Sequence, residues 1–227
     1  MSVLSRRTML LRCLPVLLAA PGGRAFAQAA SNPNSNAQLL VAAREGDLAA
    51  VERLLAAGAA PNTRNRLGKT ALLLACEKGN LALAELMLRG GADVGQPSLE
   101  GVTPLMAASY GGHAALVRRL LAAGAQTEPV DRMNKPAIVY AAAMGHAEAV
   151  DALLASGIPI DNPYEHRLTV LMWAAGQGQV AVVRLLLERG AKVEPRDDRG
   201  LSALEIARQA GHAEMVEVLT RRAPGAQ

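Results

Sequence analysis

The sequence predicts an all-α solenoid of six stacked helix-turn-helix units joined by short β-hairpin-like turns. The first observation behind this prediction is a glycine that recurs every 33 residues, at Gly46, Gly79, Gly112, Gly145, Gly178 and Gly211. The second is an alanine with the same interval, at Ala42, Ala75, Ala108, Ala141, Ala174 and Ala207. A period of this length is typical of a solenoid, because one unit cannot bury its apolar face until a neighbouring unit stacks on it.

Each copy contains the start and stop signals of two short helices. In the third copy the hydroxyl of Thr103 can cap the first helix, and Pro104 stands at the first helical position, where no backbone donor is needed. Gly112 is expected to end this helix, and Gly124 to end the second helix in the same way. Helices this short are marginal alone in water, so their stability should come from stacking.

The period also sets the predicted boundaries. We expect a repeat domain over residues 37–222, divided at about 37–64, 65–97, 98–130, 131–163, 164–196 and 197–222. Residues 28–36 are polar and predict a flexible lead-in, and residues 223–227 predict a disordered tail. Repeat four has Pro136 in place of the capping threonine, and repeat five has Arg167 in place of the turn glycine. The joint between these two repeats should therefore be the softest part of the solenoid.

The third copy carries a resemblance to a known family. Thr103-Pro104-Leu105, Gly112-His113 and Leu120-Leu121, followed by Gly124-Ala125, resemble the ankyrin repeat. The resemblance extends over residues 37–222. It implies an ankyrin-repeat solenoid that binds another protein, and it implies no shared catalytic chemistry.

The N-terminus has the pattern of an export signal. Basic residues, a short apolar run from Leu14 to Ala20 and small residues near Ala27 predict a signal peptide over residues 1–27, with cleavage after Ala29 as the alternative. Ser5-Arg6-Arg7 resembles the bacterial twin-arginine signal, although an ordinary Sec signal is the other interpretation. We therefore expect a periplasmic protein of a Gram-negative bacterium, with no membrane attachment after cleavage.

Cleavage changes the charge of the protein. The signal holds four arginines and no acidic residue, so the 24 basic residues of the precursor fall to 20, which equals the number of acidic residues. The net charge of +4 is therefore no argument for nucleic-acid binding, and none is expected.

No pattern in the chain predicts catalytic, metal-binding or cofactor-binding residues, so we expect a protein that is not an enzyme and has no cofactor. His113, His146 and His212 each follow the recurrent glycine, one per repeat, which separates them too far to share a metal. We expect them to bond to local backbone. Cys76 replaces alanine or serine of other repeats and predicts a small buried filler, and Trp173 is predicted to lie in the core.

The resemblance places a partner on the concave face, which the hairpin tips and the exposed side of each first helix would form. The candidate partner-binding residues are Leu99, Val102, Tyr110, Met133, Lys135, Met144, His166 and Leu168. A patch containing an aromatic residue and two methionines is typical of an interaction surface. The alternative for Val102 and Leu168 is that they merely pack against the neighbouring turn.

Three functions remain open from the sequence. The first is a monomeric, non-enzymatic protein–protein interaction module of the periplasm, whose partner is a protein of unknown identity. The second is a secreted effector that binds host proteins, and the third is an accessory factor of a periplasmic redox or oxidative-stress enzyme.

Overall fold

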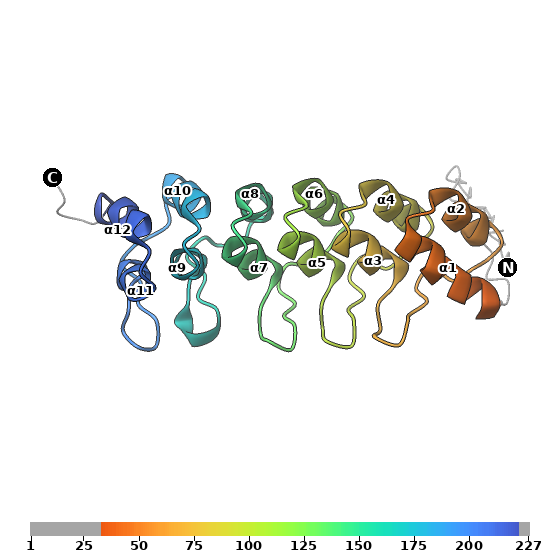
Figure 1. The fold of residues 1–227 in the computed structure, drawn as a ribbon, viewed down its shortest axis with the longest axis horizontal. Helices are drawn as coiled ribbons and strands as arrows, with labels where there is room; N and C mark the ends of the chain where they lie inside the picture. Colours follow the sequence, from red (N-terminus) through yellow and green to blue (C-terminus); the bar gives the residue numbers. More distant parts are fainter. Residues whose placement is uncertain (1–32, 223–227) are drawn as a thin grey trace, which may run out of the picture.

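The computed structural model describes residues 33–222, in which the predicted all-α fold is confirmed (Figure 1). The α-helices are α1 Pro33–Glu45, α2 Leu48–Ala56, α3 Ala71–Glu77, α4 Leu81–Arg89, α5 Pro104–Tyr110, α6 Ala114–Ala122, α7 Ala137–Ala143, α8 Ala147–Ala155, α9 Val170–Gly176, α10 Val180–Glu188, α11 Ala203–Gln209 and α12 Ala213–Thr220. A 3-10 turn, η1, spans Glu165–Arg167. The hairpin-like turns are closed by hydrogen bonds, and no strand forms within the described residues.

Side-chain caps fix where the first helix of most repeats begins. The hydroxyl of Thr103 accepts the backbone N–H of Met106 at 3.2 Å, and Thr70 and Thr169 cap α3 and α9 in the same way. Pro136 stands at the equivalent position before α7 and provides no side-chain cap. A missing cap of this kind costs about 1 kcal/mol, so α7 depends more on its packing than its neighbours do.

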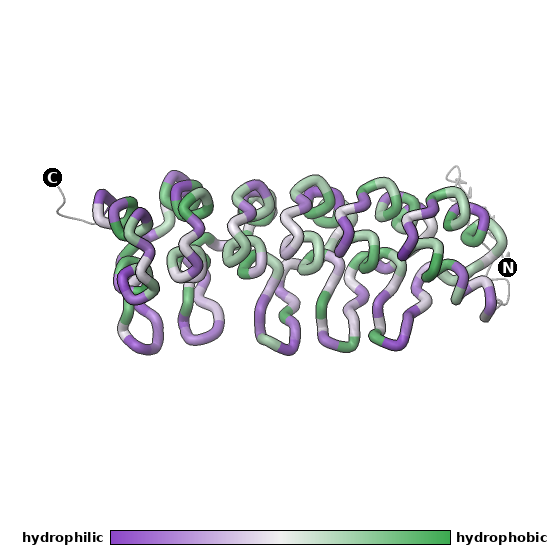
Figure 2. Tube along the Cα trace, viewed as in Figure 1, coloured by the Kyte–Doolittle hydropathy of each residue, from purple (hydrophilic) through white to green (hydrophobic). Residues whose placement is uncertain are grey.

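The helices lie in two rows, with the odd-numbered helices in one row, the even-numbered helices in the other, and the hairpin tips projecting beyond the odd row (Figure 1). Hydrophobic residues concentrate in the two helix rows, whereas the hairpins are mostly hydrophilic (Figure 2). The core between the rows is aliphatic, and its largest fully buried side chains are leucine, methionine and isoleucine. Small residues, of which Ala141 has no exposed surface, separate successive odd-numbered helices.

The slot predicted for Cys76 is a buried small-residue position. Cys76 has no exposed surface, and burial together with the nearby charge of Glu77 raises the pKa of its thiol to about 12. The equivalent residues of the neighbouring repeats, Ala43 and Ser109, are also fully buried. Because the thiol is both inaccessible and protonated at neutral pH, the prediction of an inert filler is confirmed.

The expectation that the repeat histidines bond to local backbone is wrong for His146 and His212. The imidazole Nε2 of His146 donates to the carbonyl of Tyr110 in the preceding repeat at 2.9 Å, and Nε2 of His212 contacts the carbonyl of Gly176 at 3.1 Å. Gln179 uses its side-chain amide in the same way, on the carbonyl of Ala143. The side chains of His146 and Gln179 can reach across the repeat boundary because each lies against a glycine of the preceding repeat, Gly112 and Gly145, which has no Cβ. These bonds join neighbouring repeats.

The joint between repeats four and five lacks a backbone hydrogen bond between hairpin tips that other joints have. At the tips, the backbone N–H of Arg132 donates to Glu100, and that of Asp198 donates to His166, both at 3.0 Å. Within residues 33–222 no equivalent bond joins the tips of repeats four and five.

The tip of repeat five is also strained and loosely tied. His166 and Arg167 have φ values of 57° and 58°, a left-handed conformation that is unfavourable for both residue types. In the other tips a polar side chain, such as Asp131, accepts two N–H groups of its own turn. Repeat five has Tyr164 there, which offers no carboxylate. These features agree with the predicted softness of this joint.

The first helix begins before the predicted repeat boundary. Helix α1 starts at Pro33, whereas residues 28–36 were expected to form a flexible lead-in. The side-chain carbonyl of Asn36 accepts the backbone N–H of Ala60 at 2.8 Å, which ties this polar segment to the end of repeat one. The predicted signal peptide over residues 1–27, its cleavage sites and the predicted tail over residues 223–227 lie outside the described residues.

Candidate protein-binding face

The hairpin tips and the exposed sides of α3, α5, α7, α9 and α11 form one continuous surface, which we call the loop face (Figure 1). It corresponds to the concave face expected from the sequence. Four of the predicted partner-binding residues are exposed on it: Leu99, Tyr110, Met133 and Met144 have exposed fractions of 56%, 55%, 61% and 42%. Leu67, at the tip of repeat two, is equally exposed and extends this apolar set by one repeat. Large apolar side chains thus gather on the tips and helix ends of repeats two to four.

The remaining predicted residues behave differently. Val102 and Leu168 are half-buried and pack against the core, because the position after the turn glycine directs the side chain back toward the first helix. Lys135 occupies the same position in repeat four and is also half-buried. His166 is exposed on its tip, with its ring 3.7 Å from the carboxylate of Asp198. Val102 and Leu168 therefore pack inward, against the core, and the alternative of packing against the neighbouring turn stays a prediction.

Aromatic side chains line the row of odd-numbered helices. The rings of Tyr110 and Tyr140 meet edge to face, with centroids 5.8 Å apart and an interplanar angle of 76°. The hydroxyl of Tyr140 donates to the carboxylate of Asp131, and burial, this hydrogen bond and the negative charge raise the pKa of Tyr140 above its ordinary value. The ammonium of Lys135 lies 5.0 Å from the centroid of the Trp173 ring.

The assignment of Trp173 to the core is wrong in part. Its ring is half-buried, because its position on α9 lies at the boundary between the core and the loop face. Tyr140 occupies the same position on α7, one repeat earlier. The indole Nε1 of Trp173 is buried and has no hydrogen-bond partner among the described residues. Both rings thus contribute to the loop face as well as to the packing below it.

A shallow apolar depression of about 360 Å³ lies at the centre of this row. Its walls come from three consecutive odd-numbered helices and one tip: Glu77, Val102, Met106, Ala107, Tyr110 and Tyr140. Ala107 is the reason that the depression exists, because the same position holds the large ring of Tyr140 in the next repeat. Two predicted residues, Val102 and Tyr110, line it together with Tyr140.

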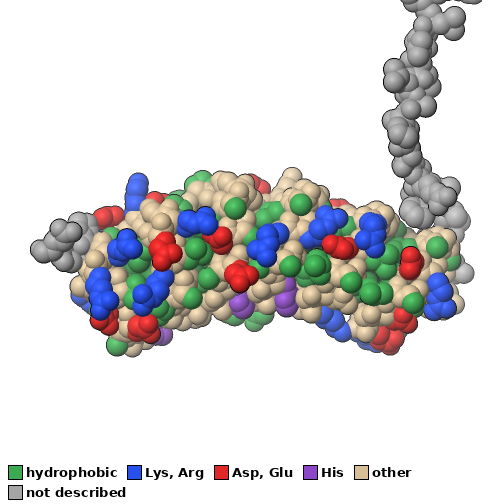
Figure 3. All heavy atoms as spheres, turned by 90° about the horizontal axis from the view of Figure 1, so that it is seen from above, with side chains coloured by type: hydrophobic (Ala, Val, Ile, Leu, Met, Phe, Trp, Pro, Cys, Tyr) green, Lys and Arg blue, Asp and Glu red, His purple; other side chains and the backbone are tan. Residues whose placement is uncertain are grey.

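The charges on the two sides of the molecule differ in arrangement. On the row of even-numbered helices, basic and acidic side chains alternate (Figure 3). On the loop face of repeats two to four, Lys69 pairs with Glu77 at 2.7 Å, and Asp131 is engaged by Tyr140. Arg66 and Arg132 form no ion pair within the described residues. The loop face therefore keeps uncompensated positive charge near the depression.

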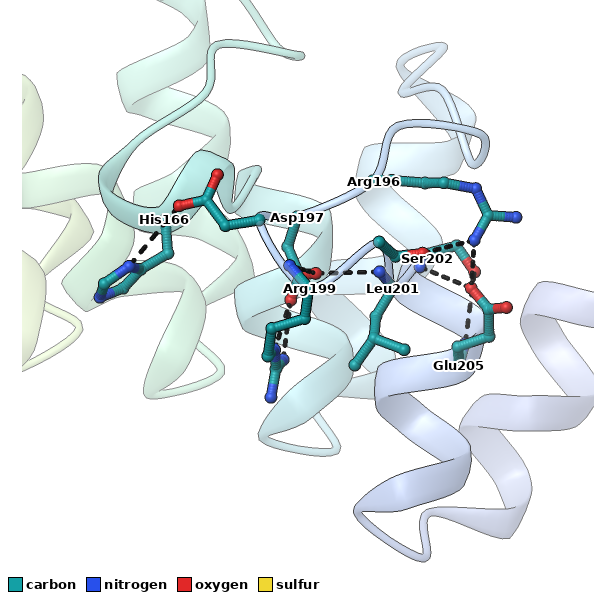
Figure 4. Close-up of polar contacts among 9 residues, drawn as sticks. His166, Arg196, Asp197, Arg199, Leu201, Ser202 and Glu205 are labelled. Carbon is teal, nitrogen blue, oxygen red and sulfur yellow. Dashed lines mark hydrogen bonds and ion pairs between the residues drawn. The ribbon is translucent and has the colours of Figure 1, made fainter.

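At repeat six, the last repeat of the loop face, the polar side chains of the tip bond mainly to groups of the same repeat (Figure 4). The buried carboxylate of Asp197 accepts the backbone N–H groups of Arg199 and Leu201, each at 2.9 Å, and the guanidinium of Arg199. Burial opposes its ionisation, but these hydrogen bonds outweigh burial and hold the pKa of Asp197 below its ordinary value. Ser202 and Glu205 form a reciprocal cap at the start of α11. Because these groups satisfy one another, they are poorly suited to bind a partner.

No other site chemistry emerges from residues 33–222. No group of three or more His, Cys, Asp or Glu side chains in this part of the chain could hold a metal ion. None of its helices has both the length and the apolar character needed to cross a membrane.

Comparison with protein families agrees with the repeat architecture. A family model described as ankyrin repeats (3 copies) matches the chain in three overlapping segments, residues 39–131, 81–164 and 138–227. Among curated proteins the comparison found no match.

Proposed function

The chain belongs to the ankyrin-repeat family, whose repeats generally mediate protein–protein interactions, and we propose that it binds a protein partner through the loop face without catalysing a reaction. The observation that carries this proposal is the set of exposed apolar side chains on the loop face of repeats two to four, of which Tyr110 lines the depression. Apolar and aromatic side chains that converge on a depression are typical of the central residues of protein interfaces.

The proposal also includes the cellular location of the protein. The pattern around Arg6 and Arg7 supports export of the precursor by the twin-arginine route and a mature protein in the periplasm. If so, replacing both arginines by lysine, which keeps the charge, should leave unprocessed precursor in the cytoplasm. Immunoblotting of cell fractions measures the result. Normal processing of this variant would instead favour Sec export, and mature protein in the culture medium would favour the secreted effector.

The binding surface can be tested by affinity capture from a periplasmic extract with three forms of the mature chain. The wild type is compared with Tyr110→Lys on the loop face and with Val130→Lys, a control at a side chain that is 45% exposed and lies outside the depression. We expect Tyr110→Lys to reduce the retained partner at least about tenfold, since a charged group would replace a central apolar contact. The control should retain the partner as the wild type does.

Two results would contradict the proposal. If no protein is retained by the wild type, or only chaperones are, the chain has no stable partner in this compartment. If Val130→Lys abolishes capture and Tyr110→Lys does not, the partner binds on another surface. Circular dichroism of both variants shows whether the fold is intact, which is expected because both side chains are largely exposed.

A further inference from the structure

The loop face carries more free positive than free negative charge in the repeats that surround the depression. Arg66 and Arg132 form no ion pair in the described part of the chain, and the ammonium of Lys135 faces a ring instead of an acid. The ammonium of Lys78 donates to the backbone carbonyl of Arg44 and forms no ion pair within residues 33–222. On the same stretch the carboxylates of Glu100 and Asp131 form no ion pair within the described residues, whereas Glu77 is paired with Lys69. The four cations therefore outnumber these two acids.

These cations have a definite position relative to the depression. Arg66 and Lys78 belong to repeat two, Arg132 and Lys135 belong to repeat four, and repeat three provides most of the apolar walls. Packed helices lie roughly 8–10 Å apart, so the two groups of cations are separated by about 16–20 Å along the solenoid. An extended chain rises about 3.3 Å per residue and would cover this span with five or six residues.

The depression requires an apolar occupant. With a volume of about 360 Å³ it exceeds the roughly 30 Å³ share of one water molecule many times. Most of its lining is apolar, and its one carboxylate, Glu77, is already paired with Lys69. A polar side chain would lose hydrogen bonds to water there and would gain few from the walls. Aliphatic or aromatic side chains are therefore the groups that this site can accept.

We propose that the loop face recognises an extended acidic peptide segment, in which apolar residues enter the depression and acidic residues on either side meet the cations of repeats two and four. This inference rests on the proposed function and specifies the chemistry of the partner. The charge complementarity positions the peptide along the solenoid, because the cations of repeats two and four flank the apolar depression. The apolar residues provide the larger part of the contact.

A nucleic acid fits the same surface less well. Stacking of bases needs open aromatic faces, but Lys135 lies over Trp173, and Tyr140 is held at the edge of Tyr110 and bonded to Asp131. The carboxylates of Glu100 and Asp131, which form no ion pair within the described residues, lie between the cations and would repel a continuous phosphate backbone. In an acidic peptide the negative charges can be confined to the positions that face the cations. A nucleic-acid strand carries a charge at every phosphate and cannot avoid the carboxylates in this way.

The inference is tested by selecting random dodecapeptides, displayed on phage, on the immobilised mature chain. We expect the enriched peptides to carry net negative charge, with acidic residues on both sides of a short apolar stretch. One enriched peptide is then synthesised, and its affinity is measured by fluorescence anisotropy. Arg66→Glu combined with Arg132→Glu should weaken binding at least about tenfold, and added salt should weaken wild-type binding.

The matched control is Arg118→Glu combined with Arg222→Glu, which changes the net charge equally at two exposed arginines away from the loop face. This control should bind the peptide as the wild type does. Enrichment of neutral or basic peptides, equal losses in both double variants, or equally tight binding of a dodecamer of deoxythymidine would overturn the inference. If capture still depends on Tyr110 while the selected peptides are not acidic, the proposed function stands and only the acidic chemistry is wrong.

Discussion

Replacing Ala141 by leucine is expected to lower the free energy of unfolding by about 1 to 3 kcal/mol, as overpacking of a close-packed core does. Ala141 has no exposed surface, and helix α7 packs against both α5 and α9. Ala108 and Ala174, at the same position in these neighbours, are also fully buried. A leucine would have to push successive repeats apart. We therefore expect the packing of α7 against both α5 and α9 to be weakened.

Urea denaturation followed by circular dichroism measures this effect. Ala115→Leu is the matched control, because Ala115 is exposed on α6 and a larger side chain meets no neighbour there. It should change stability by less than about 0.5 kcal/mol. Because repeat four lies next to the joint that is predicted to be the softest, the Ala141 variant is expected to unfold in more than one step. A variant as stable as the control would mean that the repeats do not pack closely at this position.

The repeat architecture could be predicted because it depends on a strict sequence period. A glycine or alanine that returns every 33 residues is enough to place the helices, and the capping threonines mark their starts. Thr103 caps α5 as expected, and Pro136 fails to cap α7 as expected. Such local signals act within one repeat, so they can be read without knowledge of the neighbouring repeats.

Contacts between repeats were harder to predict. His146 and His212 bond to the preceding repeat, and nothing in a single repeat indicates this, because the bond depends on the spacing of the stack. Trp173 lies at the boundary between core and surface. At such a position the helical period of the sequence does not decide whether the side chain is buried or exposed. The same ambiguity applies to Val102 and Leu168, which were expected to be exposed and are half-buried.

The sequence predicted which residues are exposed on the candidate site better than it predicted the shape of that site. Tyr110, Met133 and Met144 were expected on the partner-binding face, and they are exposed there. The depression beside Tyr110 could not be expected from the sequence, since it arises from the difference in size between Ala107 and Tyr140 on adjacent helices. Whether these residues bind a partner remains a prediction, which the capture experiment addresses.

Gly112→Ala should have the largest effect of any single change considered, a loss of about 2 to 4 kcal/mol of unfolding free energy. Gly112 has a φ of +71°, a conformation that disfavours residues with a Cβ by about 1 to 2 kcal/mol. A Cβ at this position would lie 2.5 Å from Nδ1 of His146 and 2.7 Å from its Cγ. The ring would have to move, and its 2.9 Å hydrogen bond to the carbonyl of Tyr110 would be lost, at about 1 kcal/mol.

Two further variants separate these contributions. Gly124 has a φ of +89°, but a Cβ added there would meet no atom within 4 Å, so Gly124→Ala should show the conformational effect alone, about 1 to 2 kcal/mol. Combining Gly112→Ala with His146→Ala removes the clash, so the double variant should be more stable than the sum of the two single changes predicts. Thermal and urea denaturation measure all four. If Gly112→Ala and Gly124→Ala are equally destabilising, the His146 ring does not lie against Gly112, and the hydrogen bond between repeats three and four must be assigned elsewhere.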